Sequence, residues 1–324
     1  MTVTTNGASS PTEPSVTTTA STVDQGAETV ATATPGRKPK KARPAMSVGR
    51  GFVFSAVASV AALSVWFLFY AFILTPFEEA RSQTVNYGTL RESLALQTAP
   101  IGGVITPGTP IVLIDSKPLG LNGVVVVEGT ASGDLMNGPG HLRNTVLPGQ
   151  MGTSVIMGRA SMFGGPFGKL SEAKVGDSLS VTTGQGVFTY TVESVRKAKS
   201  PLPQPLDAGK GRLTLITAIG EGKLGAWKPT GLMYVDAKLM GDAQQYPPGK
   251  PYVVTASELP LQGDPSALLP LALALPLLIG AVLFALWARS RWGTWQAWLV
   301  GVPLVLACVW AVSQAAVQLL PNLL

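Results

Sequence analysis

Three long stretches of the chain are strongly hydrophobic and carry no charged side chain. They cover residues 51–77, residues 265–288 and the part of the chain that follows Arg291. Each contains the ~20 apolar residues that a helix needs to cross the ~30 Å hydrocarbon core of a bilayer. Prolines within the second and third stretches are tolerated in membrane helices. We therefore predict transmembrane helices at 51–75, 266–288 and 294–318.

A different pattern fills residues 100–245, where short apolar or alternating runs recur between Gly, Pro, Asp and Asn residues. The runs read PIVLID, GVVVVEG, TSVIMG, SLSVTT, VFTYTVESV, RLTLIT and LMYVDAKL. Val, Ile, Thr and Tyr dominate them, and no 3.6-residue period separates them. This pattern predicts an all-β barrel or sandwich. The sequence TTGQGV at 182–187 is typical of a hairpin turn between two of the strands.

The remaining segments lack both patterns. Residues 1–50 are rich in Thr, Ser, Ala, Gly and Pro and have too few large apolar residues to build a core, which predicts a disordered tail. Residues 76–99 have no strand alternation and predict a juxtamembrane helical stalk. Residues 246–265 predict a linker that leads back to the membrane.

The composition agrees with a membrane protein and excludes several kinds of site. Charged residues make up only 13% of the 324 positions, about half of the roughly 25% found in soluble domains. One cysteine and one histidine exclude an intramolecular disulfide framework, a multi-thiolate zinc site and a His-rich metal site. We expect neither a metal nor a cofactor.

The excess of positive charge lies beside the predicted spans. The formal net charge is +6, and residues 1–50 and the loop 289–291 supply most of it, whereas residues 76–265 are close to neutral. Basic residues near spans favour the cytoplasmic side. We therefore expect the N-terminus in the cytoplasm, the first span to be a retained signal anchor, the β-domain to be extracytoplasmic, and the protein to be a three-span protein of a bacterial plasma membrane.

The basic cluster RKPKKAR at 37–43 could contact nucleic acid or anionic lipid. Its position directly before the first span favours a topological signal close to lipid headgroups. We expect membrane lipids and no nucleic acid among the partners.

Within the β-domain, an ordered set of motifs resembles the sortase family in its class D/E style. Sortases of this kind carry VxEGT, GPGH, TxxPGxxG, GHR, FGxPF, GD and YxV elements in that order. The corresponding elements here are Val127–Thr130, Gly138–His141, Thr145–Gly152, Gly158–Arg159, Phe163–Phe167, Gly176–Asp177 and Tyr190–Val192. The resemblance covers about 120–240 and implies an eight-stranded sortase β-barrel.

The same resemblance implies that the catalytic set is degenerate. Sortases cleave a sorting signal with a cysteine thiolate, supported by a histidine and an arginine, and transfer the acyl group to an amine. The cysteine position is Ala218, the histidine position is Arg159 and the arginine position is Leu232. The single cysteine, Cys308, lies within the third predicted span. We therefore expect no cysteine catalysis, and the altered positions favour a protein that is not an enzyme.

A hydroxyl nucleophile is the alternative. Thr217 adjoins the altered cysteine position, Ser154 and Ser161 flank Arg159, and His141 is the one histidine that could act as a base. A hydroxyl needs such a base, because it does not ionise by itself at neutral pH. Arg159 is always protonated and cannot serve. Thr217 could equally be a structural hydroxyl.

Binding is the other role that these positions suggest. Arg159 would place a permanent cation beside the emptied groove, where a guanidinium suits a carboxylate or phosphate. Lys228 and Trp227 are further ligand-binding candidates near the same rim. The ordinary alternatives are that Arg159 pairs with Asp177 or Glu221 or faces solvent, and that Lys228 belongs to a simple loop.

Three functions follow from these observations. The first is a membrane-anchored pseudoenzyme of sortase type that binds or scaffolds at the cell envelope, with a cell-surface protein, a sorting-signal peptide or a cell-wall component as its partner. The second is an acyltransferase or hydrolase that uses a hydroxyl nucleophile. The third is a subunit of a membrane complex in which the barrel is a docking cap.

Overall fold

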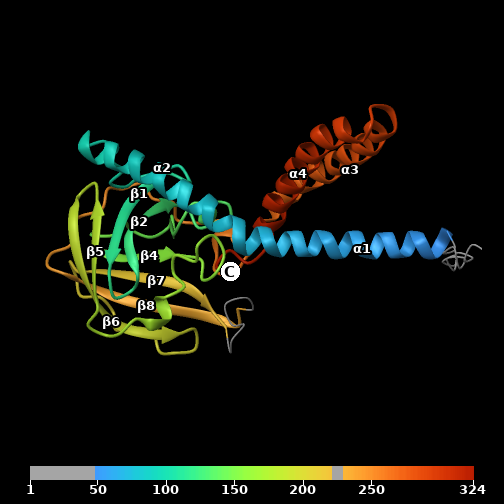
Figure 1. Ribbon diagram of the computed structural model, residues 1–324. Helices are drawn as coiled ribbons and strands as arrows, with labels where there is room; N and C mark the ends of the chain where they lie inside the picture. The colour runs from blue at the N-terminus through green and yellow to red at the C-terminus, as the bar shows by residue number, and fades with distance from the viewer. Residues whose placement is uncertain (1–47, 221–228) are drawn as a thin grey trace, which may run out of the picture. The chain divides into compact units, whose positions relative to one another are not determined.

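The computed structural model describes residues 48–220 and 229–324, and the predicted N-terminal tail lies outside them apart from its last residues. Eight strands form a closed barrel in the order β1-β2-β3-β4-β7-β8-β6-β5 (Figure 1). The strands are β1 Pro110–Ser116, β2 Leu121–Glu128, β3 Gly140–His141, β4 Gly152–Met157, β5 Ser178–Thr183, β6 Gly186–Lys197, β7 Gly211–Ile219 and β8 Gly231–Met240. The predicted eight-stranded barrel is confirmed.

The strand register follows the alternation seen in the sequence. In β5, buried and more exposed residues alternate, and the hairpin to β6 closes with Thr183 opposite Gly186. Residues that point inward from all the longer strands build the main core, among them Ile114, Val126 and Leu213. Side chains of a strand alternate between two faces, so one face of most strands builds this core. In β1 both Ile111 and Val112 belong to it, next to a register shift between Pro110 and Val112.

Strand β7 is buried on both faces, which its position in the barrel explains. It pairs in parallel with β4 and antiparallel with β8. Leu213 and Leu215 point into the main core, whereas Ile216 and Ala218 belong to a separate cluster that contains Leu323, from beyond the last helix. The outer face of β7 is therefore covered by another part of the same chain.

The first long helical segment runs from α1 Val48–Phe69 through a π-helical turn, Tyr70–Leu74, into α2 Thr75–Ala95. The turn precedes Pro76, which lacks the N–H that a regular helix would use. Gln83 of α2 binds the barrel edge: it accepts a hydrogen bond from the Val125 N–H (2.8 Å) and donates to the Val125 and Asn137 carbonyls. Helix α2 thus lies against β1 and β2 (Figure 1).

The last two long helices form an antiparallel hairpin, α3 Leu268–Arg291 and α4 Thr294–Gln318. They approach closely at small residues: a Cβ added at Gly301 would lie 3.0 Å from the Cβ of Ala285. Small residues allow such close packing between membrane helices. Pro276 and Pro303 lie inside these helices, as the sequence suggested.

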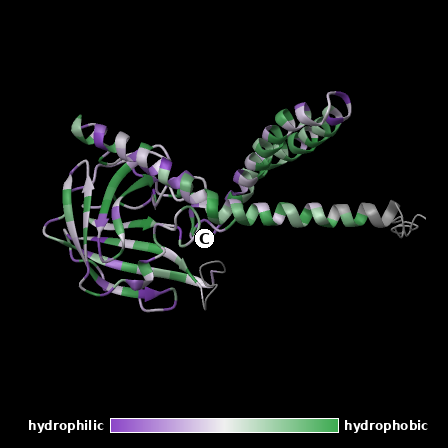
Figure 2. Cartoon of the chain, viewed as in Figure 1, coloured by the Kyte–Doolittle hydropathy of each residue, from purple (hydrophilic) through white to green (hydrophobic). Residues whose placement is uncertain are grey.

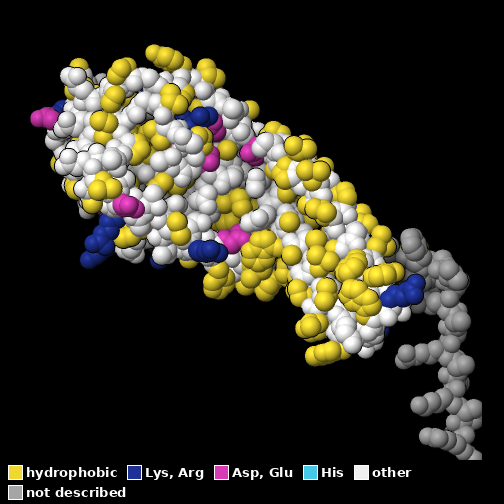
Figure 3. All heavy atoms as spheres, turned by 90° about the horizontal axis from the view of Figure 1, so that it is seen from above, with side chains coloured by type: hydrophobic (Ala, Val, Ile, Leu, Met, Phe, Trp, Pro, Cys, Tyr) yellow, Lys and Arg dark blue, Asp and Glu magenta, His cyan; other side chains and the backbone are white. Residues whose placement is uncertain are grey.

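Among the residues that the structure describes, three helices are long and apolar enough to cross a membrane, namely Val57–Ala95, Pro265–Arg291 and Thr294–Gln318. Figure 2 shows their hydrophobic character, and Figure 3 shows hydrophobic side chains gathered over the helices on the face that it presents. Leu273, Trp295 and Trp298 are each more than 60% exposed within the chain. Surfaces of this kind require a partner or a lipid environment.

Short segments connect these units. The 3₁₀ turns are η2 Asp134–Met136, η3 Leu170–Glu172, η5 Ala256–Glu258 and η6 Pro265–Ala267. The η5 turn is fixed to the barrel because Arg143 forms an ion pair with Glu258, and the Thr130 hydroxyl donates to the Glu258 carbonyl. The connection from β8 to α3 therefore packs on the barrel instead of leaving it directly.

Candidate functional site

The three positions that the motif resemblance aligns with the sortase catalytic residues meet at neighbouring strand ends. Ala218 of β7 is the register partner of Leu232 of β8. Arg159 follows β4, whose continuation is held to β7 by a hydrogen bond from the Gly158 N–H to the Ile216 carbonyl (3.0 Å). The barrel topology therefore gathers Arg159, Ala218 and Leu232 at one end of β4, β7 and β8.

Arg159 is fully enclosed by protein. Its Nη2 donates to the Ser132 carbonyl and hydroxyl (2.9 Å each), and its Nε donates to the Leu135 carbonyl (3.2 Å). The guanidinium carbon lies 4.8 Å from the centre of the Phe163 ring, a cation–π arrangement. Arg159 is 0% exposed, so the alternative that it faces solvent is wrong.

Burial also sets the electrostatics of Arg159. It lowers the pKa of the guanidinium to about 9, so that the group stays charged at neutral pH. Its Nη1 has no hydrogen-bond partner among the described residues. Asp177 instead accepts a hydrogen bond from the Lys174 N–H, and Glu221 lies outside the described residues. Ligand binding at Arg159 stays a prediction, and it would require the surrounding chain to move.

Ala218 and Leu232 contribute to an apolar cluster. Its buried members are Leu135, Met157, Ile216, Ala218 and Leu323. Leu232 and Tyr234 pack against them. The methyl group of Ala218 thus contacts hydrophobic neighbours at the position where the resemblance places a nucleophile.

The three hydroxyl alternatives, Thr217, Ser154 and Ser161, have different surroundings. The Thr217 hydroxyl is buried and donates to the Gly158 carbonyl (3.0 Å). Ser154 is also buried, and its Oγ has no hydrogen-bond partner among the described residues. Ser161 has a partner. A carbonyl oxygen accepts this hydrogen bond but does not remove the proton, so the Thr217 oxygen is not activated as a nucleophile.

His141 is held by its own neighbours. Its Nδ1 lies 2.9 Å from Oε2 of Glu128, and its Nε2 lies 2.9 Å from the Val146 carbonyl. A carbonyl only accepts, so Nε2 carries a hydrogen and cannot take one from a hydroxyl. Thr145, 3.1 Å from Nε2, donates its own proton to the Leu142 carbonyl. This arrangement ties β2, β3 and the following turn together.

Lys228 and Trp227 lie outside the described residues, so their role stays a prediction. Among the residues that the structure describes, no group of three His, Cys, Asp or Glu side chains is placed to hold a metal ion.

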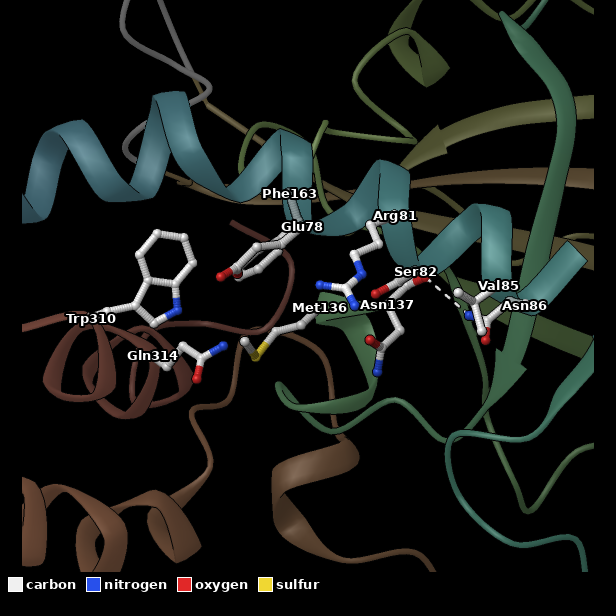
Figure 4. A pocket seen from close by; sticks show the side chains of 10 residues that line it. All are labelled: Glu78, Arg81, Ser82, Val85, Asn86, Met136, Asn137, Phe163, Trp310 and Gln314. Atoms are coloured by element: carbon white, nitrogen blue, oxygen red, sulfur yellow. Dashed lines mark hydrogen bonds between the residues drawn. The ribbon is translucent and has the colours of Figure 1, made fainter. Parts of the chain in front are cut away.

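A cavity of about 550 Å³ lies between α2, α4 and the turn at η2. Figure 4 shows Glu78 and Arg81 of α2 on one side and Trp310 and Gln314 of α4 on the other. Phe163, the residue whose ring lies beneath Arg159, also lines this cavity. The sequence did not predict this cavity, because its walls come from segments that are far apart in the chain.

The sequence also missed the segment that follows α4. Asn322 and Leu323 are 0% exposed and contact the barrel. The only local signal was an asparagine among apolar residues at the end of a predicted span, and such a pattern does not show what the residues contact.

Comparison with known proteins finds a family model that matches part of the barrel. Residues 119–221, from the start of β2 to beyond β7, match the family model described as Sortase domain. Over these residues the chain is similar to a sortase domain, in agreement with the resemblance that the motifs showed. A comparison with curated proteins finds no match.

Solved structures of sortases are similar to this chain over the barrel. A sortase D5 transpeptidase from Clostridium perfringens is 24% identical, over 50% of this chain and 99% of that one, with a TM-score of 0.40. Sortase E from Streptomyces avermitilis is 27% identical, over 42% and 91%, with a TM-score of 0.35. Sortase C from Clostridium perfringens, solved with the C-terminal cell wall sorting motif, is 20% identical, over 51% and 90%, with a TM-score of 0.37.

Proposed function

We propose that this protein is a membrane-anchored pseudoenzyme of the sortase family whose barrel binds or scaffolds a partner at the cell envelope. One observation carries the proposal: the three positions that the resemblance aligns with the catalytic set lie at an apolar cluster and a fully buried arginine, the Thr217 hydroxyl beside them donates to a carbonyl, and the single cysteine, Cys308, lies in α4. Acyl transfer needs a nucleophile and a group that accepts its proton.

The membrane part of the proposal rests on the helices and the charges. Three helices have the length and hydrophobicity of membrane spans. The basic residues before the first helix and the pair Arg289 and Arg291 favour a cytoplasmic location for both sites. The barrel then lies on the extracytoplasmic face, where a cell-surface protein, a sorting-signal peptide or a cell-wall component is the expected partner.

An enzyme of altered mechanism receives less support from the geometry. Thr217 and His141 are each bonded to other groups, so the pair does not form a nucleophile and base. A membrane-complex subunit is compatible with the proposal, since a barrel can bind a partner while the spans bind others.

The test is an assay of the full chain in detergent micelles. A peptide with a cell-wall sorting motif is incubated with the protein, with and without an amine acceptor, and cleavage and transfer products are quantified. A Thr217→Val variant is run in parallel. We expect neither product from either protein. Turnover that disappears in Thr217→Val would establish a threonine mechanism, and turnover that persists would also overturn the pseudoenzyme proposal.

A further inference from the structure

Residues 319–324 form a short segment after α4 that runs along the barrel instead of continuing as a helix. The Ala160 N–H donates to the Leu323 carbonyl (3.0 Å), and the Met162 N–H donates to the Leu324 carbonyl (3.3 Å). These bonds attach the segment to the loop directly after Arg159. The segment therefore lies at the barrel end that gathers the three family catalytic positions.

The side chain of Leu323 covers one of these positions. Leu323 is 0% exposed and packs in the apolar cluster with Ile216, Ala218 and Met157. Ile216 and Ala218 point outward from β7, away from the main core. Their burial to 5% exposure each therefore depends on what covers the outside of the barrel, and in this structure Leu323 is part of that cover.

The preceding residue holds the segment by polar contacts. Asn322 is also 0% exposed, and its side-chain amide donates to the carbonyls of Thr130 (2.9 Å) and Leu259 (3.1 Å). Its N–H donates to the Gln262 carbonyl (2.9 Å). A buried amide with defined acceptors fixes the register of the segment on the barrel.

A glycine in the β8–α3 connection supports the same fit. A Cβ added at Gly263 would lie 2.3 Å from the Leu319 carbonyl oxygen. The next residue, Asp264, donates its N–H to the Gln318 carbonyl (2.8 Å). The connection and the segment after α4 therefore approach more closely than a side chain at position 263 permits.

From these contacts we infer that residues 320–324 act as an internal ligand of the barrel. The binding surface, which we term the Leu323 site, consists of Leu135, Met157, Ile216 and Ala218. It accepts an apolar side chain, with an asparagine amide before it bound by backbone carbonyls. A peptide of this chemistry from another protein occupies the Leu323 site only after the internal segment has left. This last point rests on the proposed binding function.

A thiol reporter at position 218 tests the inference in the full chain. Cys308 is replaced in Cys308→Ser, Ala218→Cys is added, and the labelling rate with a maleimide is measured in detergent micelles. Two variants then weaken the segment, Leu323→Asp and the milder Asn322→Ala. Because local opening controls access to a buried thiol, we expect labelling to accelerate by at least ~10-fold in Leu323→Asp and less in Asn322→Ala.

Two controls separate release of the segment from loss of the fold. Val187→Cys, at a position 68% exposed, should label rapidly in every background. Val181→Cys, at a position 0% exposed in the main core, should stay protected in every background. If Val181→Cys labels faster in the Leu323→Asp background, that substitution has disturbed the main core. The test then rests on the same comparison in the Asn322→Ala background.

The outcomes for the inference and for the proposed function are distinct. Two results would overturn the inference that residues 320–324 are an internal ligand. One is rapid labelling of Ala218→Cys while the segment is unchanged, and the other is a labelling rate that increases in neither segment variant. A synthetic peptide with the sequence of residues 316–324, added to the Leu323→Asp variant, should restore protection. If the segment variants open the site but this peptide does not protect it, the internal ligand stands and peptide binding from another chain is excluded for this sequence.

Discussion

Arg159 is a buried cation that connects separate segments of the barrel. Its guanidinium donates to the Ser132 and Leu135 carbonyls and stacks on Phe163, so it holds the loop between β2 and β3 against the end of β4. A planar guanidinium fits these directions, whereas an ammonium group does not. At this position the structure gives the cation a structural role.

We therefore expect Arg159→Lys and Arg159→Ala to destabilise the barrel, by about 2–4 kcal/mol for Ala, because buried carbonyls lose their donors and a cavity forms. Unfolding by urea, followed by hydrogen exchange of barrel peptides, measures the change. Lys238→Ala, an exposed site on β8, is the control and should change stability by less than about 0.5 kcal/mol. Equal stability of Arg159→Lys and the unchanged protein would contradict this role.

Asp134 gives a pH dependence of the opposite sign to that of most carboxylates. Burial, and secondarily the negative charge of Glu258, raise the pKa of Asp134 to about 6 despite a hydrogen bond from the Ala131 backbone. The folded state then binds the proton more tightly than the unfolded chain, whose Asp has a pKa of about 3.9. The contribution of Asp134 to stability therefore falls as the pH rises from about 4 to about 6.

The substitution Asp134→Asn should remove this decrease in stability between about pH 4 and about pH 6. The unfolding midpoint of the full chain and of the variant is measured between these pH values, and the difference between the two curves isolates Asp134. We expect the variant to gain stability relative to the unchanged protein as the pH rises. A constant difference across the range would show that Asp134 does not titrate as described.

At the scale of elements, the strands were predictable and their outer covering was not. Alternation along β5 and β6 is a local property of the sequence, and it predicted both strands and the hairpin between them. The two-residue strand β3 is too short to show a pattern. The covering of Ala218 by Leu323 joins residues more than 100 positions apart, and a leucine after a membrane helix reads simply as more of that helix.

A polar cluster joins the three strands β6, β7 and β8. Asp236 is 0% exposed and accepts hydrogen bonds from Arg196 Nε (2.6 Å), the Thr214 hydroxyl (2.7 Å) and the Ser194 hydroxyl (3.1 Å). The Arg196 guanidinium also lies over the Tyr234 ring. Removal of one member of such a buried pair leaves the other without its charge partner.

Asp236→Ala should therefore destabilise the barrel by about 3–5 kcal/mol, an effect measured by urea unfolding of the full chain. The double variant with Arg196→Met tests the cause: if the unpaired guanidinium is responsible, the second substitution should recover part of the loss. If Arg196→Met does not recover any stability, the destabilisation would instead come from the lost hydrogen bonds of the Thr214 and Ser194 hydroxyls.

For the whole molecule, the distribution of charge predicts the orientation in the membrane. We replace Cys308 in Cys308→Ser and introduce single cysteines at Leu202, which is 82% exposed on the barrel, and at Ser290, in the last turn of α3. A membrane-impermeant maleimide added to intact cells should label Leu202→Cys directly and Ser290→Cys only after permeabilisation. The reverse pattern would contradict the orientation deduced from the basic residues.

The two proposals together describe a barrel of the sortase family that has lost its catalytic groups and binds its own chain at their position. The alternative is an inhibited enzyme, in which the segment at residues 320–324 covers a catalytic site that is still intact. The two cases differ in whether cleavage or transfer activity appears when the Leu323 site is opened.

Turnover by the full chain with Leu323→Asp tests this point most directly. The variant is incubated with a sorting-motif peptide and an amine acceptor, after thiol labelling at position 218 in the matching cysteine variant has shown that the site is open. The account predicts no cleavage and no transfer, because Ala218, Leu232 and the bonded Thr217 supply no nucleophile. Cleavage or transfer that begins when the segment is released would contradict it.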